Sequence, residues 1–251
     1  MAIKVYQDDA ANLKFVDTIQ TTARTLDYIV KGTGSIAESQ TLTNKTLTSP
    51  LFTGTIDGWI TAGTFTYASA TTITVASGAA SIYQKGDKIK LTQTTVKYFY
   101  ITAVADTLLT VTGGTDYTVA NAAITLPYYS HIENPLGFPT AFTSALTYGA
   151  ETGTWTSVTA AMSRFRLIGK TCFIGGAYEG TTSDSTTYLT ITLPVAPLNA
   201  NNELINVIVR NGAGWFVSTG GGEFYSSILR VSYTFTAGAN RGFKLQGFYE
   251  I

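Results

Sequence analysis

The chain has 251 residues, of which 45% are hydrophobic and only 13% are charged, so it can bury one large core or two modest ones. Its formal net charge is zero and its basic residues are scattered, which excludes the electrostatic footprint of a nucleic-acid-binding protein. With 24 glycines, 15 tyrosines, 13 phenylalanines and a high threonine content, the composition favours sheets joined by tight turns over a helical enzyme.

The residues that usually carry chemistry are scarce. Cys172 is the only cysteine, so no disulfide forms within the chain, and its apolar neighbours predict a buried, inert thiol. His131 is the only histidine, which excludes a zinc site of the ordinary His/Cys type within one chain. We therefore expect no catalytic residues, no metal and no cofactor. The N-terminus lacks a hydrophobic signal core and no apolar run spans a membrane, so we expect cytoplasmic folding without membrane insertion.

The N-terminal segment, residues 1–40, begins with a stretch that reads as a short strand or extended arm over residues 1–9. A heptad-like seam follows, in which apolar residues are spaced alternately three and four apart and predict a short helix. About two heptads are too short to be stable alone in water. The seam therefore predicts packing between copies of the chain or docking on a larger particle; the alternative is a helix packed on its own domain. The seam residues are Val16, Ile19, Ala23, Leu26 and Val30.

A threonine-rich connector occupies residues 41–60. Within it, Thr41-Leu-Thr returns as Thr46-Leu-Thr before Pro50. In the ten residues Thr41–Pro50, only Leu42 and Leu47 are available for burial, so this segment must lie against something else, and copies of itself are the simplest candidate. The phrase Thr41–Pro50 resembles a connector found in bacteriophage fibre proteins, often just ahead of a globular part.

Residues 61–130 predict a small all-β domain. Residues 88–92 alternate cleanly, which places Ile89 and Leu91 inward and Lys88 and Lys90 on the solvent face. About six short strands in this length suggest a small β-barrel-like unit, closed or half-closed. The expected strands are Thr64–Tyr67, Thr72–Val75, Lys88–Thr92, Lys97–Val104, Thr107–Val111 and Ala123–Leu126.

This domain carries a further resemblance to a domain of phage tail-fibre and adsorption proteins. Together with the connector, the similarity covers roughly residues 41–140. It implies a non-catalytic fibre component, in which His131 belongs to a linker phrase and not to an active centre. The phrases that carry it begin at Ala70 (ATTITVASG), Tyr83 (YQKGDKIKLTQ), Lys97 (KYFY), Val111 (VTGGTDY) and Tyr128 (YYSHIENPLGFP).

Residues 131–143 predict a rigid, extended linker, because Pro135 and Pro139 restrict their own backbone and that of the preceding residue. Residues 144–251 then predict a second all-β domain, an antiparallel β-sandwich of the jelly-roll type. The phrase that begins at Arg164 resembles a hairpin of the C-terminal heads of phage fibres. The expected strands are Thr154–Thr159, Met162–Ile168, Thr171–Tyr178, Thr187–Leu193, Leu204–Arg210, Gly214–Ser218, Phe224–Phe235 and Gly242–Tyr249.

Two kinds of side chain in the C-terminal domain bear on function. Glycan-degrading spikes need paired carboxylates at a defined separation, but the carboxylates here stand in apparent turns, where solvation is their ordinary role: Glu151, Glu179, Asp184, Glu203 and Glu223. Aromatic residues near Gly/Ser/Thr-rich turns can stack on sugar rings, with packing in a core or between subunits as the alternative. These candidates for receptor or glycan binding are Trp155, Tyr188, Trp215, Phe216 and Tyr225.

The residues and the resemblance together predict an all-β structural fibre protein of a phage virion. We expect a homotrimer, assembled in the host cytoplasm, that contacts other virion proteins through residues 1–40. Its C-terminal domain would bind a host cell-surface glycan or protein, and nucleic acid would not be a partner. The alternatives are a capsid head fibre or decoration protein with weak glycan binding, and a short glycan-depolymerising tailspike. A cellular carbohydrate-binding module is disfavoured by the connector and the missing export signal.

Overall fold

The computed structural model describes residues 57–199, 204–212, 214–217 and 221–251, together with the backbone of three N-terminal strands. Side chains are described from residue 57 onward, except at positions 204 and 215–217. The chain divides into two compact units, Met1–Leu51 and Phe52–Ile251. Within the described residues, no helix has the length and apolar character needed to span a membrane.

The first unit contains an antiparallel sheet of three strands, β1 (Ile3–Gln7), β2 (Leu13–Asp17) and β3 (Arg24–Thr25). The prediction of a helix starting at Val16 is wrong, because Val16 lies in β2 opposite Lys4 of β1. Two heptads give a helix little stability, whereas the aromatic and β-branched residues of β2 favour an extended backbone. The other seam positions, Ile19, Ala23, Leu26 and Val30, lie outside the described residues.

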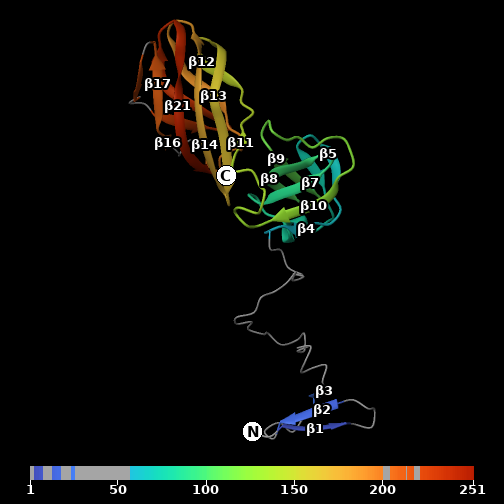
Figure 1. The fold of residues 1–251 in the computed structure, drawn as a ribbon. Helices are drawn as coiled ribbons and strands as arrows, with labels where there is room; N and C mark the ends of the chain where they lie inside the picture. The colour runs from blue at the N-terminus through green and yellow to red at the C-terminus, as the bar shows by residue number, and fades with distance from the viewer. Residues whose placement is uncertain are drawn as a thin grey trace. The chain divides into compact units, whose positions relative to one another are not determined.

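The second unit begins with an open, antiparallel sheet of seven strands (Figure 1). Its order is β4-β10-β7-β8-β9-β6-β5, so β4 and β5 are the edges and do not pair with each other. The expected strands are present, but the prediction of a barrel-like closure is wrong, because edge strands of two and four residues are too short to join. The elements are β4 (Ile60–Thr61), β5 (Thr66–Ser69), β6 (Thr72–Thr74), the 3₁₀ turn η1 (Ala79–Ser81), β7 (Lys88–Thr92), β8 (Val96–Ala105), β9 (Leu108–Thr112) and β10 (Thr125–Ser130).

The lysines of β7 do not form the expected solvent face. Ile89 and Leu91 are fully buried, as the alternation predicts, but Lys88 is only 3% exposed. The ammonium of Lys90 lies 4.6 Å from the ring centre of Trp59 and 4.5 Å from that of Tyr128. The prediction fails because other segments of the chain cover this face of β7. Alternation within one strand does not show which segments will pack against it.

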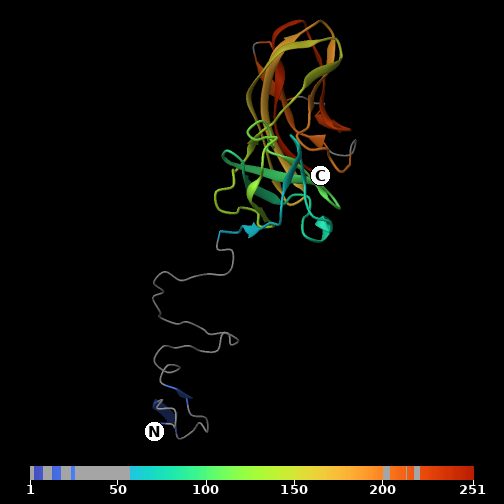
Figure 2. The same ribbon diagram turned by 90° about the vertical axis from the view of Figure 1, so that its right-hand side faces the viewer.

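The C-terminal part is a sandwich of two antiparallel sheets (Figures 1 and 2). The six-stranded sheet has the order β11-β13-β14-β21-β17-β18 and the five-stranded sheet has the order β12-β15-β20-β19-β16. Both contribute to one core, so the predicted two-sheet sandwich is confirmed, while the jelly-roll assignment stays a prediction. The strands are β11 (Phe142–Thr143), β12 (Tyr148–Thr152), β13 (Trp155–Ile168), β14 (Thr171–Thr182), β15 (Thr186–Thr192), β16 (Leu204–Ile205), β17 (Val207–Asn211), β18 (Trp215–Val217), β19 (Gly222–Tyr225), β20 (Ile228–Phe235) and β21 (Gly238–Glu250).

Phe142 joins the seven-stranded sheet to the sandwich. It is fully buried in β11, and its ring centre lies 5.3 Å from that of Tyr100 in β8 and 6.0 Å from that of Phe165 in β13. Tyr117 and Phe138 complete the group at 6.0 and 5.6 Å. Five packed aromatic rings therefore hold the two parts together, in addition to the restriction that the prolines of the linker impose.

Candidate functional site

Two of the five predicted binding residues come together on the outer face of the five-stranded sheet. Tyr188 belongs to β15 and Tyr225 to β19, and β20 runs between these strands. Arg230 of β20 lies over both rings, with its guanidinium carbon 5.1 Å from the ring centre of Tyr188 and 4.6 Å from that of Tyr225. Cation–π contacts of this kind orient both the cation and the rings.

Two carboxylates complete the group around Arg230. Its Nη1 donates to Oε1 of Glu151 at 2.9 Å, and its Nε donates to Oε2 of Glu223 at 3.0 Å. Glu151 stands on β12, next to β15, so four neighbouring strands each supply a residue. We call Glu151, Tyr188, Glu223, Tyr225 and Arg230 the tyrosine–arginine platform.

The alternation of the strands explains why these side chains share one face. Leu229 and Val231 are fully buried, so Arg230 between them points outward. Glu223 lies directly opposite Arg230 in the ladder of β19 and β20, and the two charges therefore meet as a cross-strand pair. Tyr225 follows Glu223 two residues later on the same face and is 49% exposed.

Tyr188 has a φ of 49°, which is an outlier for a bulky residue inside a strand. The register between β15 and β20 shifts at this point: Thr187 pairs with Thr234, and Leu189 pairs with Val231. One residue of β15 therefore faces two of β20, as in a β-bulge, which re-aims a side chain. Strained backbone conformations of this kind cluster at functional sites. The φ of Tyr188 is therefore a second reason, beside the ring contacts, to regard the platform as a candidate site.

The charges of the platform orient it more than they stabilise it. The hydrogen bond to Glu151, followed by that to Glu223, raises the pKa of Arg230 above its ordinary value. The side chains of Arg230, Glu151 and Glu223 are 24%, 35% and 36% exposed, so each ion pair is worth less than about 1 kcal/mol. Two carboxylates against one guanidinium leave a net charge of −1.

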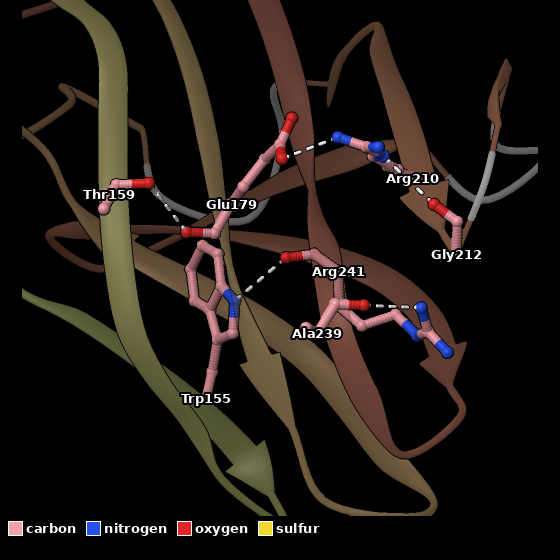
Figure 3. Close-up of polar contacts among 7 residues, drawn as sticks. All are labelled: Trp155, Thr159, Glu179, Arg210, Gly212, Ala239 and Arg241. Carbon is pink, nitrogen blue, oxygen red and sulfur yellow. Dashed lines mark hydrogen bonds and ion pairs between the residues drawn. The ribbon is translucent and has the colours of Figure 1, made fainter.

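Trp155 lies in the core of the sandwich and not on a binding surface. It is 6% exposed, and its ring packs 5.7 Å from that of Phe243 and 5.9 Å from that of Tyr148. Its Nε1 donates to the backbone oxygen of Arg241 at 3.2 Å (Figure 3). A Cβ at position 180 would lie 2.7 Å from Trp155 Nε1, so Gly180 leaves the room that the indole occupies. The packing alternative therefore describes Trp155 in this structure.

The two remaining aromatic candidates, Trp215 and Phe216, stand on β18 at the edge of the six-stranded sheet. Their backbones pair with β17, Trp215 opposite Arg210 and Phe216 opposite Val209. Their side chains lie outside the described residues. On the backbone alone they belong to a different sheet from Tyr188 and Tyr225.

The carboxylates do not gather into one centre. Glu179 on β14 accepts a hydrogen bond from Nη1 of Arg210 at 2.6 Å, and its backbone oxygen accepts one from Thr159 (Figure 3). Asp184 stands exposed in the turn between β14 and β15, and Glu203 lies outside the described residues. Each of Glu151, Glu179 and Glu223 therefore faces a guanidinium. Glu151 and Glu223 share Arg230, whereas Glu179 pairs with Arg210.

Other reactive groups lie apart from the platform. In the part of the chain that the structure describes, no three His, Cys, Asp or Glu side chains are grouped to hold a metal ion. His131 Nδ1 is 2.9 Å from Oδ1 of Asp87, next to the seven-stranded sheet. Cys172 is fully buried, as predicted, and burial raises the pKa of its thiol to about 12.

Arg230, at the centre of the platform, was not among the residues that the sequence singled out. Its place between two apolar residues in Leu229-Arg230-Val231 indicates an outward-facing position, so its exposure was accessible from the sequence. Its partners were not, because they depend on which strands become neighbours. Comparison of the chain with family models, curated proteins and solved structures found no match.

Proposed function

We propose that this chain is a structural, non-catalytic fibre protein of a bacteriophage virion that attaches the particle to the host surface through its C-terminal sandwich. The tyrosine–arginine platform carries the attachment role, because Tyr225 is exposed and Tyr188 is held in a strained conformation on the same face. The assignment to a virion rests on the connector phrase Thr41–Pro50 and the phrases of residues 70–140, which resemble phage fibre proteins. Two β-modules joined by packed aromatics suit a fibre that must transmit force without bending.

Attachment is tested by adding the purified full-length chain to susceptible bacteria before the phage. We expect the wild-type chain to bind the cells and to reduce plaque formation, and Tyr225→Ala to lose most of both effects. Phe248→Ala is the matched control, since Phe248 is 64% exposed on the outer face of the other sheet. Equal blocking by wild type and Tyr225→Ala would remove the platform from the attachment role.

The same experiment separates the neighbouring functions. Release of oligosaccharides from host polysaccharide would favour a depolymerase spike, which needs paired carboxylates at a defined separation. Absence of cell binding, with the chain present on purified particles, would favour a capsid head fibre or decoration protein. An open sheet surface suits weak, multivalent binding, and that observation keeps the decoration role as the second candidate.

We also propose that the chain is a homotrimer anchored through residues 1–40. The ten-residue segment Thr41–Pro50 has only Leu42 and Leu47 to bury and no disulfide to hold it, so neighbouring copies supply its packing. Light scattering of the full chain should give the mass of three copies, and the mass of one copy at micromolar concentration would contradict this. A chain starting near Leu51 should still fold but should fail to enter virions.

A further inference from the structure

We propose that the tyrosine–arginine platform binds an uncharged sugar and excludes acidic ones such as uronic and sialic acids. This inference rests on the proposed attachment function and names the ligand class of the same site. A lone arginine beside two tyrosines would suggest the opposite, since guanidinium groups are the usual partners of carboxylates. The two glutamates that already hold Arg230 reverse that expectation.

The first argument is the charge of the sheet. The five described strands of this sheet carry only three charged residues, Glu151, Glu223 and Arg230. Their sum is −1, and no other charge on these strands offsets it. An acidic sugar placed here would meet two carboxylates at short range, and the like charges would repel it.

The second argument is the supply of hydrogen-bonding atoms. Oε1 of Glu151 and Oε2 of Glu223 accept from Arg230. Among the described residues, nothing binds the other oxygen of either carboxylate or Nη2 of Arg230. The platform thus offers two strong acceptors and one donor side by side, which match the hydroxyl groups of a sugar.

The third argument is the pair of rings. A sugar presents an apolar face of C–H groups that stacks on an aromatic side chain. Tyr225, at 49% exposure, offers such a surface, and Tyr188 is directed to the same side by its unusual backbone. The contact with Arg230 fixes both rings before a ligand arrives, so less conformational freedom is lost on binding.

The test uses the full-length chain on an array of immobilised bacterial and plant glycans. The uncharged group includes dextran, mannan and galactan, and the acidic group includes polygalacturonate, polysialic acid and hyaluronan. We expect wild type to bind members of the uncharged group only, with a signal that changes little as salt rises to about 0.5 M. Tyr225→Ala should lower that signal at least tenfold, whereas Tyr225→Phe, which keeps the ring, should stay within about threefold.

The double variant Glu151→Gln/Glu223→Gln changes the charge of the platform from −1 to +1 while keeping its shape. We expect it to gain affinity for the acidic group by about fivefold at low salt, and to lose that gain at high salt. It should bind the uncharged group more weakly, because amides are poorer acceptors than carboxylates. Phe248→Ala serves as the control that leaves both signals unchanged.

Several outcomes would overturn the proposal. Wild-type binding to acidic glycans, or binding to none of the uncharged ones, would exclude this ligand class. Attachment to bacteria that survives periodate oxidation of the cell-surface sugars would also exclude it while leaving the attachment function intact. Binding of uncharged glycans by a chain that is absent from virions would show the reverse failure, in which the sugar site stands and the fibre function does not.

Discussion

Tyr188 has a positive φ within β15, a conformation that is unusual for a tyrosine in a strand. A positive φ costs a non-glycine residue about 1–2 kcal/mol, and glycine or asparagine would relieve part of that cost. A tyrosine is kept at this position, although its side chain is not part of the buried core. Its ring contacts the guanidinium of Arg230, so the residue with the positive φ is also a member of the platform.

Buried tyrosines set the behaviour of the protein at high pH. Tyr100 is 3% exposed and Tyr178 is 2% exposed, and burial raises the pKa of each from 10.0 to about 12. The folded state holds these protons more tightly than the unfolded chain does. The stability that follows is complete below pH 10 and is lost as the pH rises toward 12, by up to about 3 kcal/mol for each residue.

We therefore expect the free energy of unfolding, measured in urea, to fall between pH 10 and 12. Tyr178→Phe should flatten this fall, because its ring cannot ionise. At neutral pH the variant should be less stable by about 1 kcal/mol, since the hydrogen bond between Tyr178 and Ser163 is lost. Phe248→Ala, which removes no ionisable group, is the control and should leave the fall unchanged.

At the scale of the strand, the sequence indicated most elements and few of their boundaries. Alternation located β7 at residues 88–92, where the structure also places it. The run predicted as one strand over 224–235 is instead a hairpin that turns at Ser226, whose φ is 56°. The turn is formed by Ser226 and Ser227, and serine is a weaker turn signal than glycine, proline or asparagine, so the prediction ran the two strands together.

Relations between strands were harder to predict than the strands themselves. Three features depend on which distant segments become neighbours in the fold. They are the open edge of the seven-stranded sheet, the burial of Lys88 and the set of side chains that contact Arg230. Among the aromatic candidates whose side chains the structure describes, Tyr188 and Tyr225 are brought together and Trp155 is buried in the core, a difference that alternation within one strand does not reveal. Local periodicity reports which side of a strand is apolar, and it does not report what covers the other side.

Gly114 lies where the turn after β9 meets β11. It has a φ of 61°, and a Cβ there would overlap the backbone oxygen of Thr143. That oxygen accepts a hydrogen bond from the backbone of Thr115 at 2.9 Å, and Thr143 donates one to Asp116 at 2.8 Å. A Cβ at position 114 would therefore meet a backbone atom that is held by hydrogen bonds. Such an atom cannot move aside as the end of a flexible side chain can.

We expect Gly114→Ala to lower the free energy of unfolding by more than about 2 kcal/mol, from the combined strain of a positive φ and a backbone clash. Gly63→Ala is the matched control, because a Cβ there meets nothing within 4 Å and the change should stay within about 1 kcal/mol. Chemical denaturation of both variants measures the difference. Equal stabilities would show that the turn and β11 can separate without cost.

For the second unit as a whole, the aromatic group around Phe142 determines whether the seven-stranded sheet and the sandwich unfold together. Phe142 contacts rings from both parts and is fully buried. An interface that buries several aromatic rings couples the stabilities of the modules that it joins. Coupled modules would resist bending, which a fibre requires between its anchor and its binding face.

Phe142→Ala removes the central ring and leaves a cavity lined by Tyr100, Phe138 and Phe165. The free energy of unfolding should fall by about 3–5 kcal/mol. The loss should weaken the contact between the seven-stranded sheet and the sandwich more than the core of either part. In calorimetry, wild type should show one transition for the described β-modules, and Phe142→Ala should show two. Phe224→Ala, an equally buried change within the sandwich core beside Tyr249, should lower the single transition without splitting it. Two transitions in wild type would mean that the modules are independent, and the chain would then bend at residues 131–143.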